Sequence, residues 1–190
     1  HESTPVFTKD GITMYFTRNN FLNGKKGRDS KKGILLKLYK ATKNGEDWGT
    51  VSELPFNSNE YSCAHPALNV EESYLYFSSD MPGTKGESDL YRVKLDGEKF
   101  GTPENLGDEI NTGGRETFPY INQNNQLFFA SDGRNGLGGL DIYYAFLQIT
   151  VLFPMALSPI FTFTSVPMGK YKSTRDPNLI NPNSSPVVTF

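Results

Sequence analysis

The sequence predicts an all-β protein built from repeated units of short antiparallel strands, and three observations support this fold class. Residues 65–95 (HPALNVEESYLYFSSDMPGTKGESDLYRVKL) and residues 117–146 (TFPYINQNNQLFFASDGRNGLGGLDIYYAF) carry the same landmarks in the same order. Self-similarity at a period of tens of residues indicates a repeat architecture. Aromatic residues make up 13% of the chain, with 18 glycines and 12 prolines, which is typical of many strands joined by tight turns. Long runs with helical periodicity are few.

A third, more diverged copy begins at Ser3 (STPVFTKDGITMYFTRNN) and continues at 36–41 (LKLYKA) after a long insertion. The three copies begin at Pro5, Pro66 and Pro119, which are 61 and 53 residues apart. An aromatic pair and a closing hydrophobe-Tyr pair follow in each copy: Tyr15-Phe16 and Leu38-Tyr39, Tyr76-Phe77 and Leu90-Tyr91, Phe128-Phe129 and Ile142-Tyr143. The first two copies then reach Trp48-Gly49 and Phe100-Gly101, so we expect Trp48 to be a core residue of an outer strand.

Each element of the middle copy has a recognisable pattern. The stretch Ser73 to Ser79 is almost continuously apolar, which predicts a strand covered on both sides. Residues 91–95 alternate apolar and charged side chains, which predicts a strand with one buried face. Between them, residues 80–88 supply the proline and glycines of a turn, and residues 132–139 of the third copy are richer still in glycine.

A strand after the proline, a buried aromatic strand, a glycine-rich turn, an amphipathic strand and an aromatic-Gly step describe a four-stranded antiparallel sheet. Sheets of this kind pack face to face around an axis as the blades of a β-propeller. A single blade cannot bury both of its faces, so each needs neighbours. The sequence therefore predicts a partial β-propeller of about two and a half blades over residues 1–146, too few to close a ring of the usual four to eight blades.

The net charge of the chain and its distribution limit the functions that the sequence allows. A formal net charge of −2 and a pI near 5.7 argue against a nucleic-acid-binding protein, which is usually strongly basic. Between Arg18 and Lys43, however, nine Lys or Arg accompany a single acid, Asp29. This segment is interpreted either as a solvated loop extended by self-repulsion or as an anion-binding loop for a glycan, a lipid headgroup or an acidic partner.

The repeat resembles a known family at particular segments. The pattern P-A-L, then L-Y-F-S-S-D-x-P-G and D-L-Y, followed by P-E-N-L-G-D-E-I-N-T-x-G-x-E and the next F-P, is similar to the TolB-type, WD-like propeller repeat. The segments FTRNN, ELPFNSNEYSCAHPAL, LGDEINTGGRETFPYI and LGGLDIYYA resemble the propeller of Bacteroidetes OmpA-family envelope proteins over residues 3–146. The usual Pro-Asp-Gly-like turn is kept at residues 9–11 but replaced at 70–72 and 123–125, which predicts weaker turn geometry there.

The resemblance implies a periplasmic scaffold associated with the outer membrane, in which association with the membrane is indirect. In that family the propeller lies between a tetratricopeptide region and an OmpA-like peptidoglycan-binding domain, and some members belong to the type nine secretion apparatus. Contact with peptidoglycan would require that second domain. The chain begins without Met or a signal peptide, so we expect it to be an excerpt of a longer protein.

Residues 147–190 depart from the repeat and are left unassigned, with three interpretations. They carry six of the 12 prolines and only four charged residues. A break in the reading frame would explain why the repeat stops within a unit, and a divergent strand pair would complete the last blade. The third interpretation is a membrane segment over 146–169, which is uncharged but interrupted by prolines.

Catalytic and cofactor motifs are absent from the sequence. Neither histidine begins an HExxH spacing, no GxSxG pentapeptide occurs, and the lone Cys63 has no second thiol for a disulfide or metal site. His65, directly before a proline at a strand start, is expected to pack and hydrogen-bond. The weak Ca²⁺ candidates are the aspartates that flank the glycine-rich turns: Asp80, Asp89, Asp132 and Asp141. The favoured interpretation is that they cap turns by accepting backbone N–H groups. No metal or cofactor is therefore predicted.

These observations predict a non-enzymatic module that binds a protein or another envelope component through its loops, with no nucleic-acid partner. Candidate contacts lie in the insertion at 19–32, the two glycine-rich turns and the link at 105–115. The individual candidates are Arg18, Asn19, Asn20, Lys25, Lys26, Arg28, Asp80, Asp132 and Arg134. The alternative is a substrate-gating propeller of a hydrolase, either a prolyl-oligopeptidase-like peptidase or a glycosidase.

Overall fold

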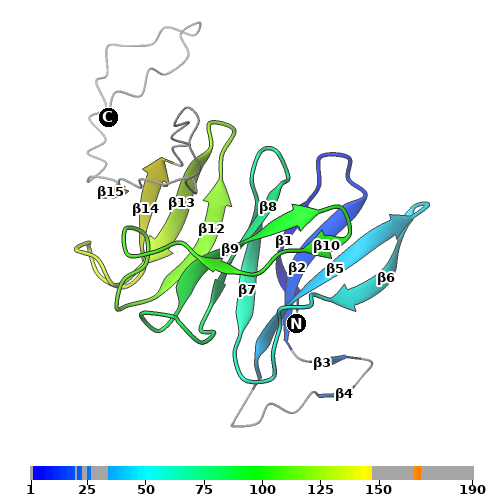
Figure 1. Cartoon of the computed structure of the whole chain (residues 1–190), viewed down its shortest axis with the longest axis horizontal. Coiled ribbons are helices and arrows are strands. Elements are labelled where there is room, and N and C mark those ends of the chain that lie inside the picture. Colours follow the sequence, from blue (N-terminus) through cyan, green and yellow to red (C-terminus); the bar gives the residue numbers. More distant parts are fainter. Residues whose placement is uncertain (1, 20, 23–24, 27–33, 147–164, 168–190) are drawn as a thin grey trace, which may run out of the picture.

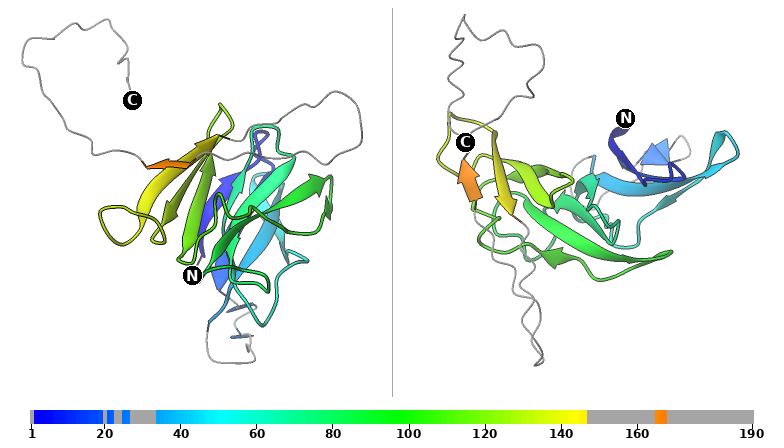
Figure 2. Two further views of the ribbon diagram at one scale, coloured as in Figure 1. Left: turned by 60° about the vertical axis from the view of Figure 1, so that its left-hand side comes forward. Right: turned by 90° about the horizontal axis from the view of Figure 1, so that it is seen from above.

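All regular structure in the described part of the chain is β, as predicted. The computed structural model describes residues 2–19, 21–22, 25–26, 34–146 and 165–167. These residues form three antiparallel sheets that lie side by side, none of them closed on itself (Figures 1 and 2). A separate two-stranded hairpin, β3 (Phe21–Leu22) with β4 (Lys25–Lys26), lies within the basic insertion.

Each sheet adds its strands in the order in which they occur in the chain. The first sheet is β1 (Glu2–Phe7), β2 (Thr13–Asn19), β5 (Leu36–Asn44) and β6 (Asp47–Glu53). The second is β7 (Cys63–Leu68), β8 (Tyr74–Ser79), β9 (Asp89–Asp96) and β10 (Lys99–Phe100), with β11 (Glu104–Asn105) also paired to β9. The third is β12 (Glu116–Ile121), β13 (Gln126–Ser131), β14 (Asp141–Phe146) and β15 (Ser165–Pro167).

The first strand of every sheet contains the same backbone irregularity. Thr4, His65 and Phe118 each directly precede the proline of their repeat and have φ values of 45°, 58° and 51°. A residue before proline normally adopts an extended conformation, and a positive φ is uncommon for any residue other than glycine. At each of these points the pairing register shifts, as in a β-bulge. The bulge is therefore a structural signature of the repeat.

The hairpin that leaves this strand is also the same in the three sheets. Gly11, Glu72 and Asn125 occupy one turn position with φ values of 68°, 54° and 55°. The N–H of each donates to the carbonyl three residues earlier at 2.9 to 3.0 Å. The prediction that the second and third turns are weakened was therefore wrong. Side chains compensate for the missing glycine, because the amide oxygen of Asn69 or Asn122 accepts two backbone N–H groups within its own turn.

The core lies between the sheets, and the same packing is used twice. β7 contacts β1, β2 and β5 of the first sheet, and β12 contacts β7, β8 and β9 of the second. Between the first two sheets are the buried side chains of Tyr15, Leu38, Leu75, Phe77, Tyr91 and Val93. Between the second and third are those of Tyr76, Leu90, Leu127, Phe129, Tyr143 and Ala145. A smaller cluster of Phe16, Tyr39 and Ala41 lies on the other face of the first sheet.

Burial confirms one strand prediction and corrects two others. β8 is buried on both faces over 75–79, as its continuous apolar pattern predicted. β9 is also buried on both faces at its start, because Arg92 lies with its guanidinium 4.8 Å from the ring centre of Tyr74 and donates two hydrogen bonds to Glu104. Trp48 belongs to the outer strand β6 but is 39% exposed, so the prediction that it is a core residue was wrong.

One strand comes from the C-terminal segment that departs from the repeat. β15 pairs antiparallel with β14, with Val166 opposite Tyr144. This is the place that β11 occupies in the second sheet, where Glu104 lies opposite Arg92. A proline is tolerated in such an outer strand. The rest of 147–190, with most of the segment considered as a membrane span, lies outside the described residues. Among the residues that are described, no helix is long and apolar enough to cross a membrane.

Candidate binding surface

The connections that the sequence singled out lie at one end of the sheets, the lower end in Figure 1. Because the strands of each sheet alternate in direction, the β2–β5 insertion, the β8–β9 and β13–β14 turns and the links between sheets leave from the same edge. We call this edge the loop end and the opposite edge the hairpin end. Of the candidates in the insertion, Asn20 and Arg28 lie outside the described residues, and Lys25 and Lys26 form β4.

Asp80 and Asp132 occupy equivalent positions just after the second strand of their sheets. The Asp80 carboxylate accepts the N–H of Ser62 at 2.6 Å, and the Asp132 carboxylate accepts the N–H of Arg115 at 2.7 Å. Each bond ties the link that enters a sheet to that sheet's second strand. The N–H and the guanidinium of Arg115 lower the pKa of Asp132 below its ordinary value. These two carboxylates therefore stabilise the fold and also remain accessible to solvent.

Asp89 and Asp141 close the glycine-rich turns. The Asp89 carboxylate accepts the N–H groups of Lys85 and Gly86 at 2.9 and 3.3 Å, and also the side-chain amide of Asn105 at 2.7 Å. The Asp141 carboxylate accepts the N–H groups of the corresponding turn at 2.7 and 3.2 Å. The four Ca²⁺ candidates are therefore engaged with backbone donors. Within the described ranges no three His, Cys, Asp or Glu side chains form a group that could hold a metal ion.

Two of the three arginines among the predicted contacts, Arg18 and Arg134, lie in the described residues and are packed against the protein. Arg18 donates to Glu2 at 2.8 Å, and its guanidinium lies about 5.5 Å from the ring centres of two aromatic residues of the first sheet. Arg134 donates to the carbonyl groups of Glu109 and Ile110 at 2.6 and 2.9 Å. Arg134 thereby joins the second glycine-rich turn, residues 132–139, to the link between sheets. Asn19 ends β2 and lies opposite Leu36.

Two asparagines in the links hold a leucine near the start of the third strand of a sheet, and the sequence analysis missed them. The Asn111 amide accepts the N–H of Leu90 at 2.8 Å and donates to its carbonyl at 3.0 Å. In the first sheet Asn57 makes the same pair of bonds to Leu38, at 3.0 and 2.7 Å. One signal for them was available in the sequence: each asparagine comes a few residues after a leucine, Leu54 or Leu106, that directly follows an outer strand.

Glu116 has a side chain of the type that catalytic sites use, but in this fold its role is structural. It begins β12 and its side chain is fully buried. Its carboxylate accepts the N–H and hydroxyl of Thr112 at 2.8 and 2.7 Å and the hydroxyl of Ser131 at 2.5 Å. A buried carboxylate needs such donors, because burial without them is costly. Glu116 therefore fixes the end of the link against the third sheet.

His65, in β7 of the second sheet, contacts both neighbouring sheets. Its backbone N–H donates to the Thr17 hydroxyl at 2.8 Å, its Nδ1 lies 2.7 Å from the Thr117 hydroxyl and 3.2 Å from the Ser78 hydroxyl, and its ring stacks on Phe118 with centres 4.0 Å apart. Burial lowers the pKa of His65 to about 4, so the ring is neutral at pH 7. The Ser78 hydroxyl is itself buried between sheets. This arrangement joins the sheets, and a nucleophile there would be closed to substrate.

Charges of both signs alternate at the loop end. Lys85 pairs with Asp108 at 3.0 Å, and Arg115 pairs with Glu87 at 3.5 Å and with Asp132 at 2.7 Å. All of these side chains keep contact with solvent. The described part of the loop end therefore has the mixed polar character common at the rim of protein interfaces.

The comparisons with known proteins give no family for this chain. A scan against protein-family models gives no match, and a search of curated proteins gives no significant match. Function must therefore be argued from the fold and the arrangement of these residues.

Proposed function

We propose that this chain is a non-enzymatic binding module of the β-propeller type, and that it binds a protein partner of the cell envelope through its loop end. The propeller assignment is supported by three sheets in the same strand order, with the same bulge before proline and the same face-to-face packing. Radial repetition of such sheets is what defines a propeller. The envelope location, in the periplasm or at the outer membrane, is supported by the resemblance of residues 3–146 to OmpA-family propellers.

One observation carries the non-enzymatic assignment: in the described part of the chain, the buried acidic side chains and the histidine that could do chemistry are engaged in hydrogen bonds within the repeat. Asp89, Asp141 and Glu116 accept N–H groups of turns and links, and His65 joins three sheets. A catalytic group must instead be free to reach substrate. The mixed charges of the loop end, on loops that a rigid scaffold holds, favour recognition of a polar protein surface.

Site-specific photo-cross-linking in the source cells tests this proposal. A photoreactive amino acid at Asp108 or Lys85 places the probe at the loop end, where both side chains are exposed. The same probe at Glu46, in the β5–β6 turn of the hairpin end, is the matched control. We expect one discrete protein adduct from the loop end and none from Glu46. Equal adducts from both ends, or none from either, would contradict binding through the loop end.

The hydrolase alternative is tested separately with the same chain. A fluorophosphonate probe labels serine nucleophiles that an adjacent base activates. We expect no labelling of this chain, because Ser78, the serine whose hydroxyl lies 3.2 Å from the His65 ring, is buried. Labelling that a Ser78→Ala substitution removes would overturn the non-enzymatic assignment.

A further inference from the structure

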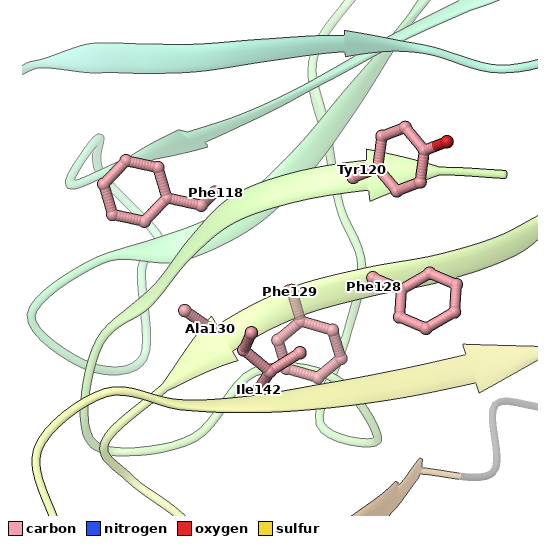
Figure 3. A pocket seen from close by; sticks show the side chains of 6 residues that line it. All are labelled: Phe118, Tyr120, Phe128, Phe129, Ala130 and Ile142. Atoms are coloured by element: carbon pink, nitrogen blue, oxygen red, sulfur yellow. The ribbon is translucent and has the colours of Figure 1, made fainter. Parts of the chain in front are cut away.

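The apolar hollow on the third sheet follows from the repeat and calls for no separate partner. It has a volume of about 490 Å³ and is lined by residues of β12, β13 and β14: Phe118, Tyr120, Phe128, Phe129, Ala130 and Ile142 (Figure 3). In the second sheet the equivalents of Tyr120, Phe128 and Ile142 are buried, because β12 of the next sheet lies across β7, β8 and β9. A further sheet of the same repeat would cover the hollow in the same way.

Three of the nine cations between Arg18 and Lys43 have a place in the first sheet. They pair with acids from elsewhere in the chain at 2.8, 2.7 and 2.5 Å: Arg18 with Glu2, Lys37 with Glu53 and Lys40 with Glu98. Of the other six, five fall between β2 and β5, where the sequence has a single acid. The excess of positive charge is therefore concentrated in the insertion at the loop end.

Two of these five cations, Lys25 and Lys26, form β4. This strand pairs with β3, so that Lys26 stands opposite Phe21 and Lys25 opposite Leu22. Figure 1 shows the two strands beyond the ends of β2 and β5, at the loop end. We call β3 and β4 the basic hairpin. Its pairing sets two adjacent lysines against apolar residues instead of acids, so an acidic group from outside the hairpin would stabilise it.

The link between the second and third sheets presents charge of the opposite sign. Lys85 pairs with Asp108, and Arg115 pairs with Glu87. In both pairs the carboxylate side chain is the more exposed member, at 84% against 46% for the first pair and 74% against 51% for the second. The loop end therefore carries a basic hairpin beside the first sheet and outward carboxylates beside the other two.

This distribution of charge discriminates among the anionic partners that a basic hairpin could bind. A membrane of anionic lipids is a continuous negative surface, and it would repel the exposed carboxylates of Glu87 and Asp108. An acidic polysaccharide has no apolar groups to match Phe21 and Leu22. A protein surface combines acidic, apolar and basic residues over short distances, so it can complement both parts of the loop end.

We propose that the basic hairpin binds an acidic segment of the protein partner through Lys25 and Lys26. The inference rests on the proposed function and names the chemistry of the partner at one part of the loop end. Complementary charges fix the orientation of a partner and raise the rate of encounter. Because the loop end has opposite charges at its two parts, it accepts such a partner in one orientation.

Fluorescence anisotropy of the full chain with a labelled random copolymer of glutamate and tyrosine tests the inference. Binding should weaken as salt rises from about 0.1 to about 1 M, because the Debye length then falls from about 10 to about 3 Å. Lys25→Glu/Lys26→Glu should weaken binding at least about tenfold, since two attractions become repulsions. The matched control Lys9→Glu/Lys43→Glu makes the same change of net charge at exposed residues of the hairpin end, and its affinity should stay within about twofold of the wild type.

Circular dichroism checks that the variants fold. If the charge reversal does not fold, Lys25→Gln/Lys26→Gln replaces it and should weaken binding at least about threefold. The inference is overturned if the copolymer does not bind, or if the two double variants lose equal affinity. Binding to phosphatidylglycerol vesicles that requires the two lysines, without binding to the copolymer, would identify a membrane surface and also overturn it.

Cross-linking from Asp108 in the source cells separates this inference from the proposed function. We expect Lys25→Glu/Lys26→Glu to remove most of the adduct that the wild-type chain gives. An adduct that the variant retains in full leaves the proposed function in place and overturns the inference. Absence of the adduct from the wild-type chain contradicts the proposed function, whereas the copolymer experiment tests the basic hairpin independently.

Discussion

Replacing Asn111 by alanine should destabilise the fold, because this side chain anchors the link between the second and third sheets. The Asn111 side chain is 1% exposed, and its amide makes three hydrogen bonds: to the N–H and carbonyl of Leu90 and to the side chain of Asn105. In the alanine variant the Leu90 carbonyl keeps the N–H of Leu106 at 3.0 Å. The N–H of Leu90 loses the Asn111 amide oxygen at a buried position.

The magnitude follows from these contacts. Leaving a buried N–H without a partner costs about 1–3 kcal/mol, and each of the other two bonds contributes about 1 kcal/mol at most. We therefore expect Asn111→Ala to lower the free energy of unfolding by about 2–4 kcal/mol. Asn57→Ala removes the equivalent pair of bonds to Leu38 in the first sheet and should cost about 1–3 kcal/mol for the same reason.

Equilibrium urea unfolding at one fixed protein concentration measures both effects, since self-association would add a concentration-dependent term. Asn124→Ala is the matched control, because Asn124 lies in an exposed hairpin turn and only its backbone N–H is bonded there. This control should change stability by less than about 0.5 kcal/mol. If Asn111→Ala behaves like Asn124→Ala, the link is not held by this amide and the reasoning is refuted.

Three further predictions concern His65, the glycine-rich turns and the close approach of the β8–β9 turn to the link between the second and third sheets. Burial lowers the pKa of His65 to about 4, below its ordinary 6.5. The contribution of neutral His65 to the stability of the fold is therefore complete above pH 6.5 and is lost as the pH falls to 4. His65→Asn should remove about 2 kcal/mol of this pH dependence, and a pH profile of unfolding that the substitution leaves unchanged would refute the prediction. Asp89→Asn should cost about 1–3 kcal/mol and speed amide exchange in its turn, more than Asp141→Asn, because Asp89 is fully buried; equal effects would show that burial does not set the cost. A Cβ on Gly86 would clash with the carbonyl of Gly114, whereas a Cβ on Gly113 would meet nothing within 4 Å. In thermal melts, Gly86→Ala should therefore be destabilised by about 2–4 kcal/mol and Gly113→Ala should be nearly unchanged. Similar melting of the two alanine variants would contradict the packing of the links.

The repeat made the sheets predictable, because strand alternation and turn residues are local properties of the sequence. The aromatic pairs at Tyr76-Phe77 and Phe128-Phe129 were enough to place the central strands. The left-handed turn residues were not predictable from their types, since Glu72 and Asn125 keep the geometry that glycine provides in the first unit. Their turns are held by an asparagine side chain, which a search for a Pro-Asp-Gly turn overlooks.

The roles of polar residues in the links were the least predictable part of the candidate surface. Asn111 and Glu116 have residue types that usually indicate a solvated loop, and only their position between two sheets buries them. The same reasoning explains the error at Trp48. Its counterpart Phe100 packs against a preceding sheet, but the described chain has no sheet in front of the first one. A pattern repeated along the chain therefore predicts a contact only where the neighbouring unit is present.

The most direct test of the proposed function is the comparison of cross-linking at Asp108 with cross-linking at Glu46 in living source cells. Asp108 is an exposed residue of the loop end, and Glu46 is an exposed residue of the hairpin end on the same scaffold. The account predicts one discrete protein adduct at Asp108, located in the cell-envelope fraction, and no adduct at Glu46. Adducts of equal yield at the two positions, or no adduct at Asp108, would contradict a protein-binding module that acts through its loop end.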